Sequence, residues 1–383
     1  MIQIDDKKNC CGCSACAQRC PKNCIVMKED DEGFLYPEVN LDLCVNCGLC
    51  DKVCPIKEKS EINNYPKGYV AVNENDEIRL NSSSGGIFTP LAEMILREGG
   101  AVFGAAFDIS CYIVKHICVD STEGLEALRG SKYVQSRIED TYIQVQKALT
   151  QDVKVLFSGT PCQIAGLKAY LGKEYELLYT VDILCHGVPS PSVWRKYLEK
   201  QESVHGSAVR RTFFRHKNYG WKMYALSLEF SNDKAYEQIF TKDPFMQMFL
   251  WNICLRPSCY ACKFKNISHT ADITLGDAWG VENYMPDMDD DKGTSLILVH
   301  SNKGSELLNI VLEKYNIRCK QVDVERMLPK TADSRKSVDE HRHRDRFIRK
   351  LRANKSFDQL FSTMQDNIFD RVKGKLKRIA GKG

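Results

Sequence analysis

A repeated run of cysteines near the N-terminus constrains the fold of this chain more than any other feature. Eight of its 18 cysteines fall into two copies of the spacing C-x2-C-x2-C-x3-C-P, the first ending at Pro21 and the second at Pro55. Three closely spaced thiolates wrap one four-iron cube in a tight loop, and the fourth follows on a short helix that the proline ends. The pattern therefore predicts two iron–sulfur clusters in this part of the chain.

The fourth cysteine of such a run reaches across to the other cube, as in two-cluster ferredoxins. Two further cysteines, Cys11 and Cys24, lie off the motif and are expected to be spectators. The ligand sets that we expect are Cys10, Cys13, Cys16 and Cys54 for one [4Fe–4S] cluster, and Cys44, Cys47, Cys50 and Cys20 for the other.

A disulfide scaffold and a pair of zinc knuckles are the alternatives for such a pattern. Disulfide-rich domains are usually short and secreted, whereas residues 1–6 lack the apolar core of a signal peptide. Zinc sites usually pair two C-x2-C units across a longer loop, without a repeated run that ends in proline. Many free cysteines then indicate a reducing cytoplasm, in an anaerobe because oxygen damages exposed clusters.

Length and composition allow two or three domains with a sizeable core, since the chain has 383 residues and 43% hydrophobic content. No apolar stretch is long enough for a membrane span, so none is expected. The charge is uneven, because the segment from Arg342 onward carries thirteen Lys and Arg against four Asp and Glu. A basic tail therefore follows a mildly acidic body.

The first 58 residues are expected to form an α+β ferredoxin-like dicluster domain. Between the two cysteine runs, apolar residues 25–27 and 34–36 flank the turn sequence DDEG, which predicts a hairpin. The polar stretch 57–67 is the expected linker to the next domain.

Strand, turn and helix patterns then alternate from Tyr69 to Gln201, which predicts an α/β domain over residues 65–340. Its sheet is expected to be largely parallel at first and mixed overall, because a more β-rich stretch follows. The strands that we expect are 69–72, 101–107, 113–119, 153–157, 177–184, 209–214, 225–230, 272–275 and 295–299, and the helices are 82–97, 141–149, 162–171 and 191–201.

The C-terminal tail, residues 341–383, has apolar residues at helical spacing from Phe347 to Val372, which predicts an amphipathic helix over 342–377. One interpretation is a helix packed on the body with its basic face in water. Another is a landing surface for an acidic electron carrier or an anionic membrane. No base-reading module is present, so nucleic acid is not an expected partner.

Four cysteines outside the N-terminal part occupy suggestive places. Cys162 and Cys185 each follow a predicted strand, where open α/β sheets bind ligands, and Cys259 and Cys262 form a C-x2-C pair. A third [4Fe–4S] cluster on these four residues is consistent with the pattern. Buried cysteines that act as small apolar residues, or a catalytic thiol at Cys162 or Cys185, are the alternatives.

The serine–glycine loop 82–86 precedes a predicted helix, where backbone N–H groups and the helix dipole favour an anion. Serine repeats also form ordinary caps and loops. The loop lacks the lysine of a P-loop, which argues against a nucleotidase.

Six motifs occur in order: NSSSGG at 81–86, RGSKY at 129–133, SGTPCQ at 158–163, CYACKF at 259–264, ADITLGDAWG at 271–280 and KGTS at 292–295. Together they resemble the coenzyme F420 hydrogenase/dehydrogenase beta-subunit family over residues 65–340. The resemblance implies an FAD-binding α/β domain with an additional [4Fe–4S] cluster on Cys162, Cys185, Cys259 and Cys262. It further implies FAD contacts from Ser83, Ser84, Gly85, Gly86, Ser131, Lys132, Tyr133, Asp277, Thr294 and Ser295.

Two residues are candidates for catalysis under this resemblance. His186 is placed to donate a proton beside the flavin, or is a structural histidine bonded to the backbone. Lys132 is placed to stabilise the reduced, anionic flavin, or is a surface lysine. Cys185 is followed by His186 and Gly187. Hydrogenase subunits that use coenzyme F420, a deazaflavin, carry an acidic residue nearby, so this sequence departs from their pattern at this point.

The function that follows is an iron–sulfur flavoprotein oxidoreductase. Electrons would pass between a ferredoxin-type carrier, the [4Fe–4S] clusters, FAD and a small-molecule substrate, because a flavin holds zero, one or two electrons. The segment 213–222, FFRHKNYGWK, mixes bases and aromatics and suits an anionic, planar or sugar-phosphate substrate. The alternative is a non-enzymatic adaptor that hands electrons to a partner subunit.

Overall fold

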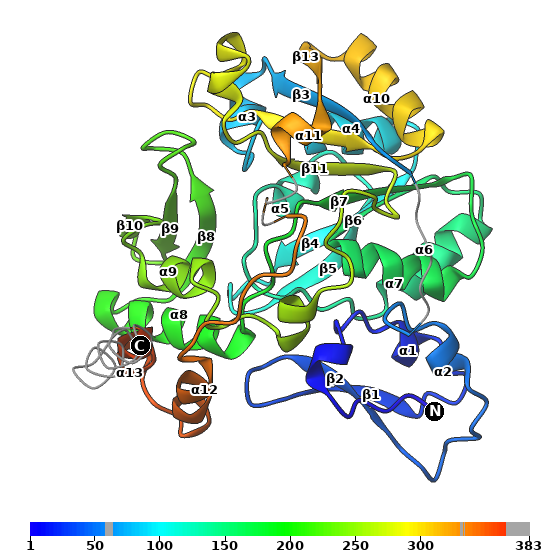
Figure 1. Cartoon of the computed structure of the whole chain (residues 1–383), viewed down its shortest axis with the longest axis vertical. Helices are drawn as coiled ribbons and strands as arrows, with labels where there is room; N and C mark the ends of the chain where they lie inside the picture. Colours follow the sequence, from blue (N-terminus) through cyan, green and yellow to red (C-terminus); the bar gives the residue numbers. More distant parts are fainter. Residues whose placement is uncertain (58–63, 330–331, 333, 365–383) are drawn as a thin grey trace, which may run out of the picture.

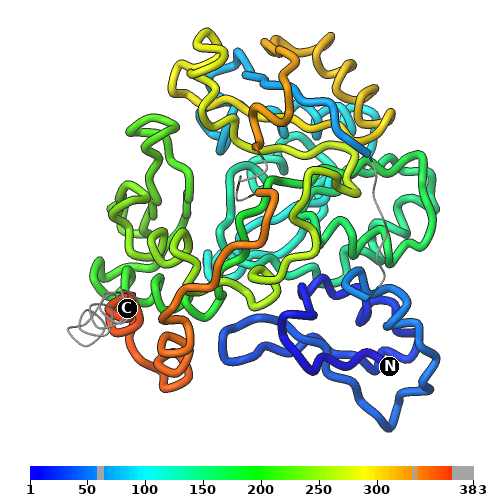
Figure 2. The backbone as a smooth tube through the Cα atoms, in the orientation of Figure 1, coloured from blue at the N-terminus to red at the C-terminus, as the bar shows by residue number. Residues whose placement is uncertain are grey.

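The computed structural model describes residues 1–57, 64–329, 332 and 334–364 of the chain. Figure 1 shows a small N-terminal part beneath a large sheet with helices on both faces, and a separate three-stranded sheet to one side. The backbone trace in Figure 2 runs from the N-terminal part through the large sheet and ends beside the smaller sheet. Within the described ranges, no helix combines the length and the apolar character needed to cross a bilayer.

The N-terminal part is a hairpin with two short helices. Strand β1 (Ile25–Glu29) pairs antiparallel with β2 (Leu35–Val39), which confirms the predicted hairpin. Its turn is tight because Gly33 has φ +80° and Asp30 Oδ1 accepts the N–H of Phe34 at 3.0 Å. Helices α1 (Ala15–Gln18) and α2 (Leu49–Lys52) follow the cysteine loops.

The main sheet has eight strands in the order β13-β3-β12-β11-β7-β6-β4-β5. The four neighbours β11, β7, β6 and β4 are parallel, and the strands outside them pair antiparallel, so the expected mixed sheet is present. The bounds are Lys67–Asn73 (β3), Ala101–Phe107 (β4), Val114–Val119 (β5), Val155–Gly159 (β6), Leu178–Ile183 (β7), Ile273–Asp277 (β11), Ser295–Val299 (β12) and Ile317–Val322 (β13).

Helices cover both faces because successive strand residues point to opposite sides. Val102 packs with the cluster of α4 (Phe88–Arg97) and α10 (Asn302–Lys314), and the next residue, Phe103, packs with that of α6 (Thr141–Thr150) and α7 (Pro161–Leu171). Cys11, Cys13, Val53 and Ile56 belong to the second cluster. The N-terminal part is therefore held against α6 and α7 by apolar burial.

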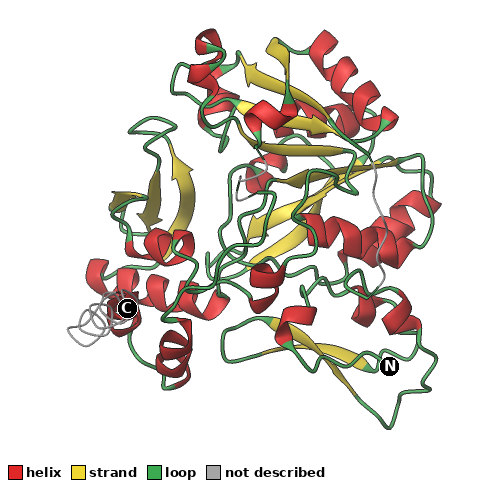
Figure 3. Ribbon diagram, in the orientation of Figure 1, coloured by secondary structure: helices red, strands yellow, loops and turns green. Residues whose placement is uncertain are grey.

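The smaller sheet is antiparallel, in the order β10-β9-β8, and Figure 3 shows it apart from the main sheet. It shares a core with α8 (Pro191–His205) and α9 (Pro244–Leu250), in which Trp194 and Phe245 are fully buried. The strand bounds are Val209–His216 (β8), Ala225–Phe230 (β9) and Ala235–Ile239 (β10).

Several elements differ from the sequence predictions. The helix expected from Ser82 starts at Phe88, because Gly86 has φ +82° and cannot continue a right-handed helix. A separate helix, α3 (Asp76–Leu80), precedes the loop. The pattern analysis also missed β10, α9, α10 and β13, together with α5 (Leu125–Leu128), α11 (Val324–Met327) and the 3₁₀ turns Lys7–Asn9, Pro257–Ala261, Val281–Asn283, Pro286–Met288 and Ser362–Met364.

The tail is not one continuous helix in its described part. Helix α12 (Arg344–Arg352) ends near Asn354, whose φ is +51°, and α13 (Phe357–Phe361) restarts with a capping box at Ser356. Residues 365–377 of the predicted helix lie outside the described residues. Phe347, Leu360 and Met364 are buried in the core around α8, so this part is packed on the body.

Candidate iron–sulfur and cofactor sites

The first predicted cysteine set lines one cavity in the N-terminal part. The loop before α1 supplies Cys10 and Cys13, α1 itself supplies Cys16, and Cys54 comes from the segment after α2. Burial, followed by the charges of Cys10 and Cys54, raises the pKa of the Cys16 thiol to about 12. A bound cation is what stabilises thiolates in such surroundings. The set is Cys10, Cys13, Cys16 and Cys54.

The second set lines a separate cavity next to the first. Cys47 is exposed, whereas Cys50 is buried and its sulfur accepts the N–H of Ile2 at 3.1 Å. The off-motif Cys24 is also buried here, with its sulfur 3.3 Å from that of Cys20. The set is Cys20, Cys44, Cys47 and Cys50, so the structure brings together each crossed group that the spacing predicts.

All eighteen cysteines are free. Across the described part of the chain, no three or more His, Cys, Asp or Glu side chains are grouped around a point that one metal ion would fill. Four thiolates spread around a cavity suit a cube, because each thiolate binds a different iron atom. The donor type and the arrangement therefore fit [4Fe–4S] clusters.

The third cysteine set lies at the edge of the main sheet. Cys162 follows β6 and Cys185 follows β7, and these strands are parallel neighbours, so their carboxyl ends meet at one edge. Cys259 and Cys262 come from the turn Pro257–Ala261 and its end, and all four cysteines line one cavity. Cys11 lines this cavity as well.

Burial governs the chemistry of this third set. It raises the pKa of Cys259 to about 12, and it raises the pKa of Cys185 well above the ordinary range, with further contributions from neighbouring thiols. A reactive thiol needs a lowered pKa and an electropositive surrounding. The environment therefore disfavours a catalytic thiol at Cys185 and suits a group of metal-bound thiolates.

The serine and glycine residues implied in cofactor binding come together at the same edge of the sheet, since Ser295 pairs with Asp277 at the carboxyl end of β11, a parallel neighbour of β7. Ser83 Oγ accepts the N–H of Ser131 at 2.7 Å, and Ser84 Oγ donates to the carbonyl of Thr294 at 2.8 Å. The N–H of Gly85 donates to Ser295 Oγ at 2.9 Å. Three of the six sequence motifs, at 81–86, 129–133 and 292–295, therefore form one structural unit.

Close backbone approach explains the glycines of this unit. A Cβ on Gly85 would clash with the carbonyl of Ala71 and lie 2.6 Å from the amide nitrogen of Ser295. The buried ammonium of Lys217 donates to the carbonyls of Arg79, Ser84 and Lys292, each at 2.7 Å. Burial, followed by the nearby charge of Arg215, lowers the pKa of Lys217 to about 7.

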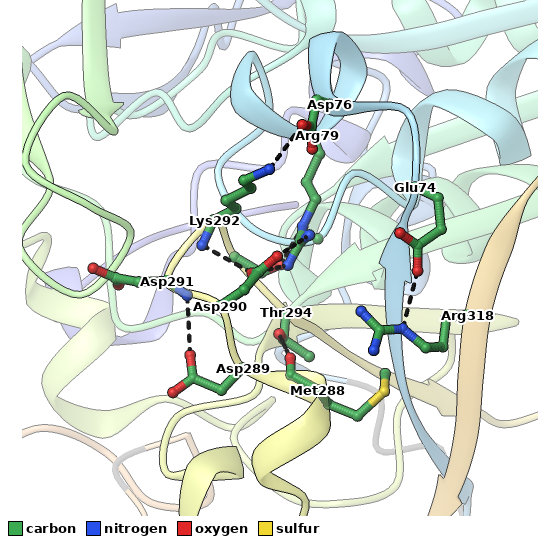
Figure 4. A network of polar contacts seen from close by, with 12 residues as sticks. Glu74, Asp76, Arg79, Met288, Asp289, Asp290, Asp291, Lys292, Thr294 and Arg318 are labelled. Atoms are coloured by element: carbon green, nitrogen blue, oxygen red, sulfur yellow. Dashed lines mark hydrogen bonds and ion pairs between the residues drawn. The ribbon is translucent and has the colours of Figure 1, made fainter.

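A polar network braces the loop that precedes Thr294 (Figure 4). The buried Arg79 donates from Nη1 to Asp290 at 2.8 Å and from Nε to the carbonyl of Gly293 at 2.9 Å. Lys292 forms an ion pair with Asp76 at 2.7 Å, and the hydroxyl of Thr294 donates to the carbonyl of Met288 at 2.5 Å. These contacts fix the loop 287–292.

Asp277 ends β11 and is engaged by protein groups. Arg215 donates to both of its carboxylate oxygens, at 3.0 and 3.1 Å, and Trp221 Nε1 donates at 2.9 Å. Trp279, half exposed, stacks on Trp221 with ring centroids 4.4 Å apart. The buried Nε of Arg215 has no hydrogen-bond partner in the described structure, which fits a polar ligand at this place.

The two catalytic candidates lie apart. The ammonium of Lys132 donates to the carbonyls of Ala127 and Arg129, both at 2.8 Å, and burial lowers its pKa to about 7. His186 lines the third cysteine cavity, and its Nε2 lies 2.7 Å from Asn252 Oδ1. Phe249 lies between the two regions. Its ring stacks on Tyr133, the residue after Lys132, with centroids 4.6 Å apart, and meets the ring of His186 with centroids 5.1 Å apart.

Sequence reasoning missed a buried polar network behind the third cavity. Asp182 is fully buried and accepts from His269 Nδ1 at 2.8 Å, and Thr274 lies 2.8 Å from His300 Nε2. Burial disfavours protonation of His269, but the charge and hydrogen bond of Asp182 outweigh it and raise the pKa. No short-range signal marks these residues, because they come from separate strands and loops.

Two family models match the chain. Residues 9–57 match the 4Fe-4S dicluster domain, and residues 152–325 match the model that describes the C terminus of the coenzyme F420 hydrogenase/dehydrogenase beta subunit. The chain is therefore an iron–sulfur protein whose N-terminal domain is of the type that binds two [4Fe–4S] clusters. Residues 152–325 form a domain of the coenzyme F420 hydrogenase/dehydrogenase beta-subunit type.

Curated relatives carry related names. The coenzyme F420-dependent sulfite reductase of Methanocaldococcus jannaschii is 23% identical over 365 residues, which are 90% of this chain and 53% of the relative. An F(420)H(2) dehydrogenase subunit of Methanosarcina mazei is 20% identical over 171 residues, 40% of this chain and 46% of the relative. The chain thus spans about half the length of the curated relatives it matches.

A solved structure of the F420-reducing [NiFe] hydrogenase complex from Methanosarcina barkeri is also similar. The matched hydrogenase chain is 17% identical to this one, and the match covers 80% of this chain and 93% of the hydrogenase chain, with a TM-score of 0.47.

Proposed function

We propose that this protein is an iron–sulfur oxidoreductase that transfers electrons between a one-electron carrier and a two-electron, flavin-type cofactor. The observation that carries the proposal is the arrangement of three four-cysteine sets around three separate cavities. Two of these sets belong to the dicluster domain, and the third lies at the ligand-binding edge of the main sheet.

The cavities are arranged in series. Cys11 and Ile56 belong to the walls of both the first and the third cavity, so these two sites share a boundary. Cys50 of the second set contributes to the raised pKa of Cys16 in the first, which reflects their proximity. An electron that enters near the exposed Cys47 would therefore have a continuous route toward the main sheet.

The proposed third cluster would be held by Cys162, Cys185, Cys259 and Cys262. The thiolates of this set would remain charged when bound to iron, despite their burial. His269 and Asp182 form a buried pair behind this cavity, and the raised pKa of His269 favours a positive charge near the cluster.

The flavin-type cofactor, FAD in our proposal, would lie against the Ser83–Gly86 loop, Ser131 and Thr294–Ser295. A flavin supplies exchange of one or two electrons, which links cluster chemistry to hydride chemistry. Arg215 would contribute its unpartnered Nε, and Lys217 and Arg79 hold the loop in place through carbonyl contacts. Lys132 would stay near Ser131 as a proton-holding group.

We propose coenzyme F420 as the external hydride carrier, and it is the first substrate to test. The support is the names of the relatives, which include a coenzyme F420-dependent reductase and a component of an F420H2 dehydrogenase. A ferredoxin-type carrier is the proposed one-electron partner, because the dicluster domain exposes Cys47.

A second candidate is an adaptor protein without a substrate of its own. The observation that favours it is the exposure of Leu41, Leu43 and Val45 beside the exposed Cys47, since large apolar side chains near a redox centre suit a protein partner.

The test starts with anaerobic purification and a count of iron and flavin per chain. The proposal expects roughly twelve irons, in three four-iron cubes, and flavin absorbance. Dithionite-reduced protein should then reduce added F420, or F420H2 should reduce the protein. Colourless protein with stoichiometric zinc would contradict the proposal, and reduction of the clusters without any reaction with F420 or other small oxidants would favour the adaptor.

Cys259→Ala separates the third cluster from the other two. The variant should lose about one third of the iron while the ferredoxin-type signals remain, because Cys259 does not line either N-terminal cavity. Cys254→Ala is the matched control, since Cys254 is also buried near this turn but lines none of the three cavities. Unchanged iron in Cys259→Ala would remove the third cluster from the proposal.

A further inference from the structure

One buried arginine connects the dicluster domain to the third cysteine site. Arg256 lies just before the turn Pro257–Ala261, and its side chain is completely buried. Its guanidinium donates from Nε to the carbonyl of Cys10 at 2.8 Å and from Nη2 to the carbonyl of Leu35 at 2.9 Å. Nη1 donates to Gln135 Oε1 at 2.8 Å. All three acceptors are neutral.

The same guanidinium approaches a predicted cluster ligand. Nη2 lies 3.6 Å from Cys10 Sγ, within hydrogen-bond distance for sulfur. Arg256 also lines the third cavity with Cys162 and Cys185, so it stands between the two sites. A Cβ on Gly12 would lie 2.8 Å from Nη1, so the cysteine loop needs glycine at this point to admit the arginine.

Aromatic rings complete the enclosure of this charge. The guanidinium lies over the ring of Tyr36 at 4.3 Å and near that of Phe34 at 5.3 Å from the centroids. Stacking of this kind stabilises a cation without neutralising it.

Arg256 differs from the other buried arginines in lacking a carboxylate partner. Arg344 pairs with Glu32 at 2.6 Å and Arg215 pairs with Asp277 at 3.0 Å. Over residues 1–57, 64–329, 332 and 334–364, no Asp or Glu forms an ion pair with Arg256. A buried charge without a counter-charge is costly, so the surroundings must supply negative charge in another form. Thiolates bound to iron would supply it here.

We propose that Arg256 is the counter-ion of the cluster on Cys10, Cys13, Cys16 and Cys54 and raises its reduction potential. Net charge and hydrogen bonds to sulfur are known determinants of cluster potential. In the reduction step, an external one-electron donor is oxidised and the cluster gains its electron, with no bond or proton change. The fixed cation stabilises that additional negative charge and so favours the reduced form.

The consequence for electron flow depends on the function proposed above. A raised potential would collect the electron at the cluster whose wall contains Cys11, next to the third site. The effect of Arg256 on the first cluster does not itself depend on the third cluster, on FAD or on F420.

The test is a dithionite redox titration of the holoprotein followed by electron paramagnetic resonance. Arg256→Met should shift the potential of one N-terminal cluster downward at unchanged iron content, and Arg256→Lys should shift it less because the charge remains. Arg344→Met is the matched control, because Arg344 also anchors the N-terminal part while its charge is already paired with Glu32. It should leave the potentials in place.

Gln135→Glu tests the charge without removing the arginine. The substitution places a carboxylate beside Nη1 of Arg256, so it should also lower the potential of the same cluster. If Arg256→Met loses iron, Gln135→Glu is the variant that tests the effect of the Arg256 charge on the cluster potential. Wild-type potentials in iron-replete Gln135→Glu would overturn the proposal and leave Arg256 as an anchor between domains. Absence of F420 reactivity or of the third cluster would instead count against the proposed function alone.

Discussion

Cys11 and Cys162 line the same cavity, at the boundary between the N-terminal part and the main sheet. Cys11 lies between two predicted ligands of the first cluster, and Cys162 is a predicted ligand of the third. Both thiols are buried, and the pKa of each is raised well above its ordinary value. An off-motif cysteine thus lies in the wall that the first and third cysteine sites share.

Cys11→Ala should slow electron transfer from the dicluster domain to the proposed flavin-type cofactor while iron content stays unchanged. The reason is that the substitution removes a sulfur atom from the wall shared by the first and third cavities but removes none of the predicted ligands. Rapid mixing of oxidised protein with a ferredoxin-type donor, followed at flavin wavelengths, measures the rate. Cys111→Ala is the control, because Cys111 is equally buried in the separate core around α8. Equal rates in the two variants would show that the sulfur of Cys11 has no part in electron transfer.

How much of this site the sequence could predict depends on how far apart in the chain the contacting residues lie. The ligand sets of the dicluster domain were readable because spacing within a run of cysteines sets them. Strands such as β4 and β6 were readable because their pattern is local. Arg256 was not, since its partners Cys10 and Leu35 lie more than two hundred positions away and only the folded chain brings them together.

In the tail, a local sequence pattern predicted a longer continuous helix than the structure contains. Apolar spacing indicated one helix, but Asn354 adopts a left-handed conformation and Ser356 caps a new helix. The break turns Phe357 onto Tyr197, with ring centroids 5.2 Å apart. Periodicity does not distinguish one long helix from two shorter helices that share a buried face.

Phe357→Ala should destabilise the protein because its ring is buried against α8. Truncation of a buried phenylalanine costs about 3–5 kcal/mol in free energy of unfolding. Urea unfolding followed by tryptophan fluorescence measures the loss, since Trp194 lies in the same core. Val204→Ala on α8 is the control, because Val204 is 68% exposed and should change little. A loss of similar size in both variants would contradict the packing of the tail on the body.

Gly85→Ala should disrupt the serine–glycine loop. The added Cβ would clash with Ala71 and crowd the amide nitrogen of Ser295, so the hydrogen bond from Gly85 to Ser295 would be lost. We expect flavin content to fall strongly while the iron of the dicluster domain stays, because the cysteine cavities of that domain are lined by other residues. Flavin absorbance and iron assay on the same sample measure both. Gly172→Ala is the control, since its surroundings are open, with no atom near the added Cβ. Its φ of +68° predicts only a small loss of stability.

The ion pair between Arg79 and Asp290 predicts how the loop responds to acid. Burial acts to raise the pKa of Asp290, but hydrogen bonds from Arg79 and from the backbone of Lys292 outweigh it and lower the pKa below its ordinary 3.8. A carboxylate with a lowered pKa adds stability above the ordinary value, and that stability is lost as the pH falls through the folded value. The pair should therefore protect the loop at neutral pH and fail in strong acid.

Asp290→Asn isolates this contribution. The variant should unfold at lower urea at neutral pH, by on the order of 1 kcal/mol, because Arg79 is buried and loses its charged partner while Asp290 itself is partly exposed. The difference between wild type and variant should shrink as the pH falls below about 4. Asp76→Asn is the control, since its pair with Lys292 is exposed on both sides and contributes little. A difference that stays constant across the acid range would show that Asp290 stabilises the loop by geometry rather than by charge.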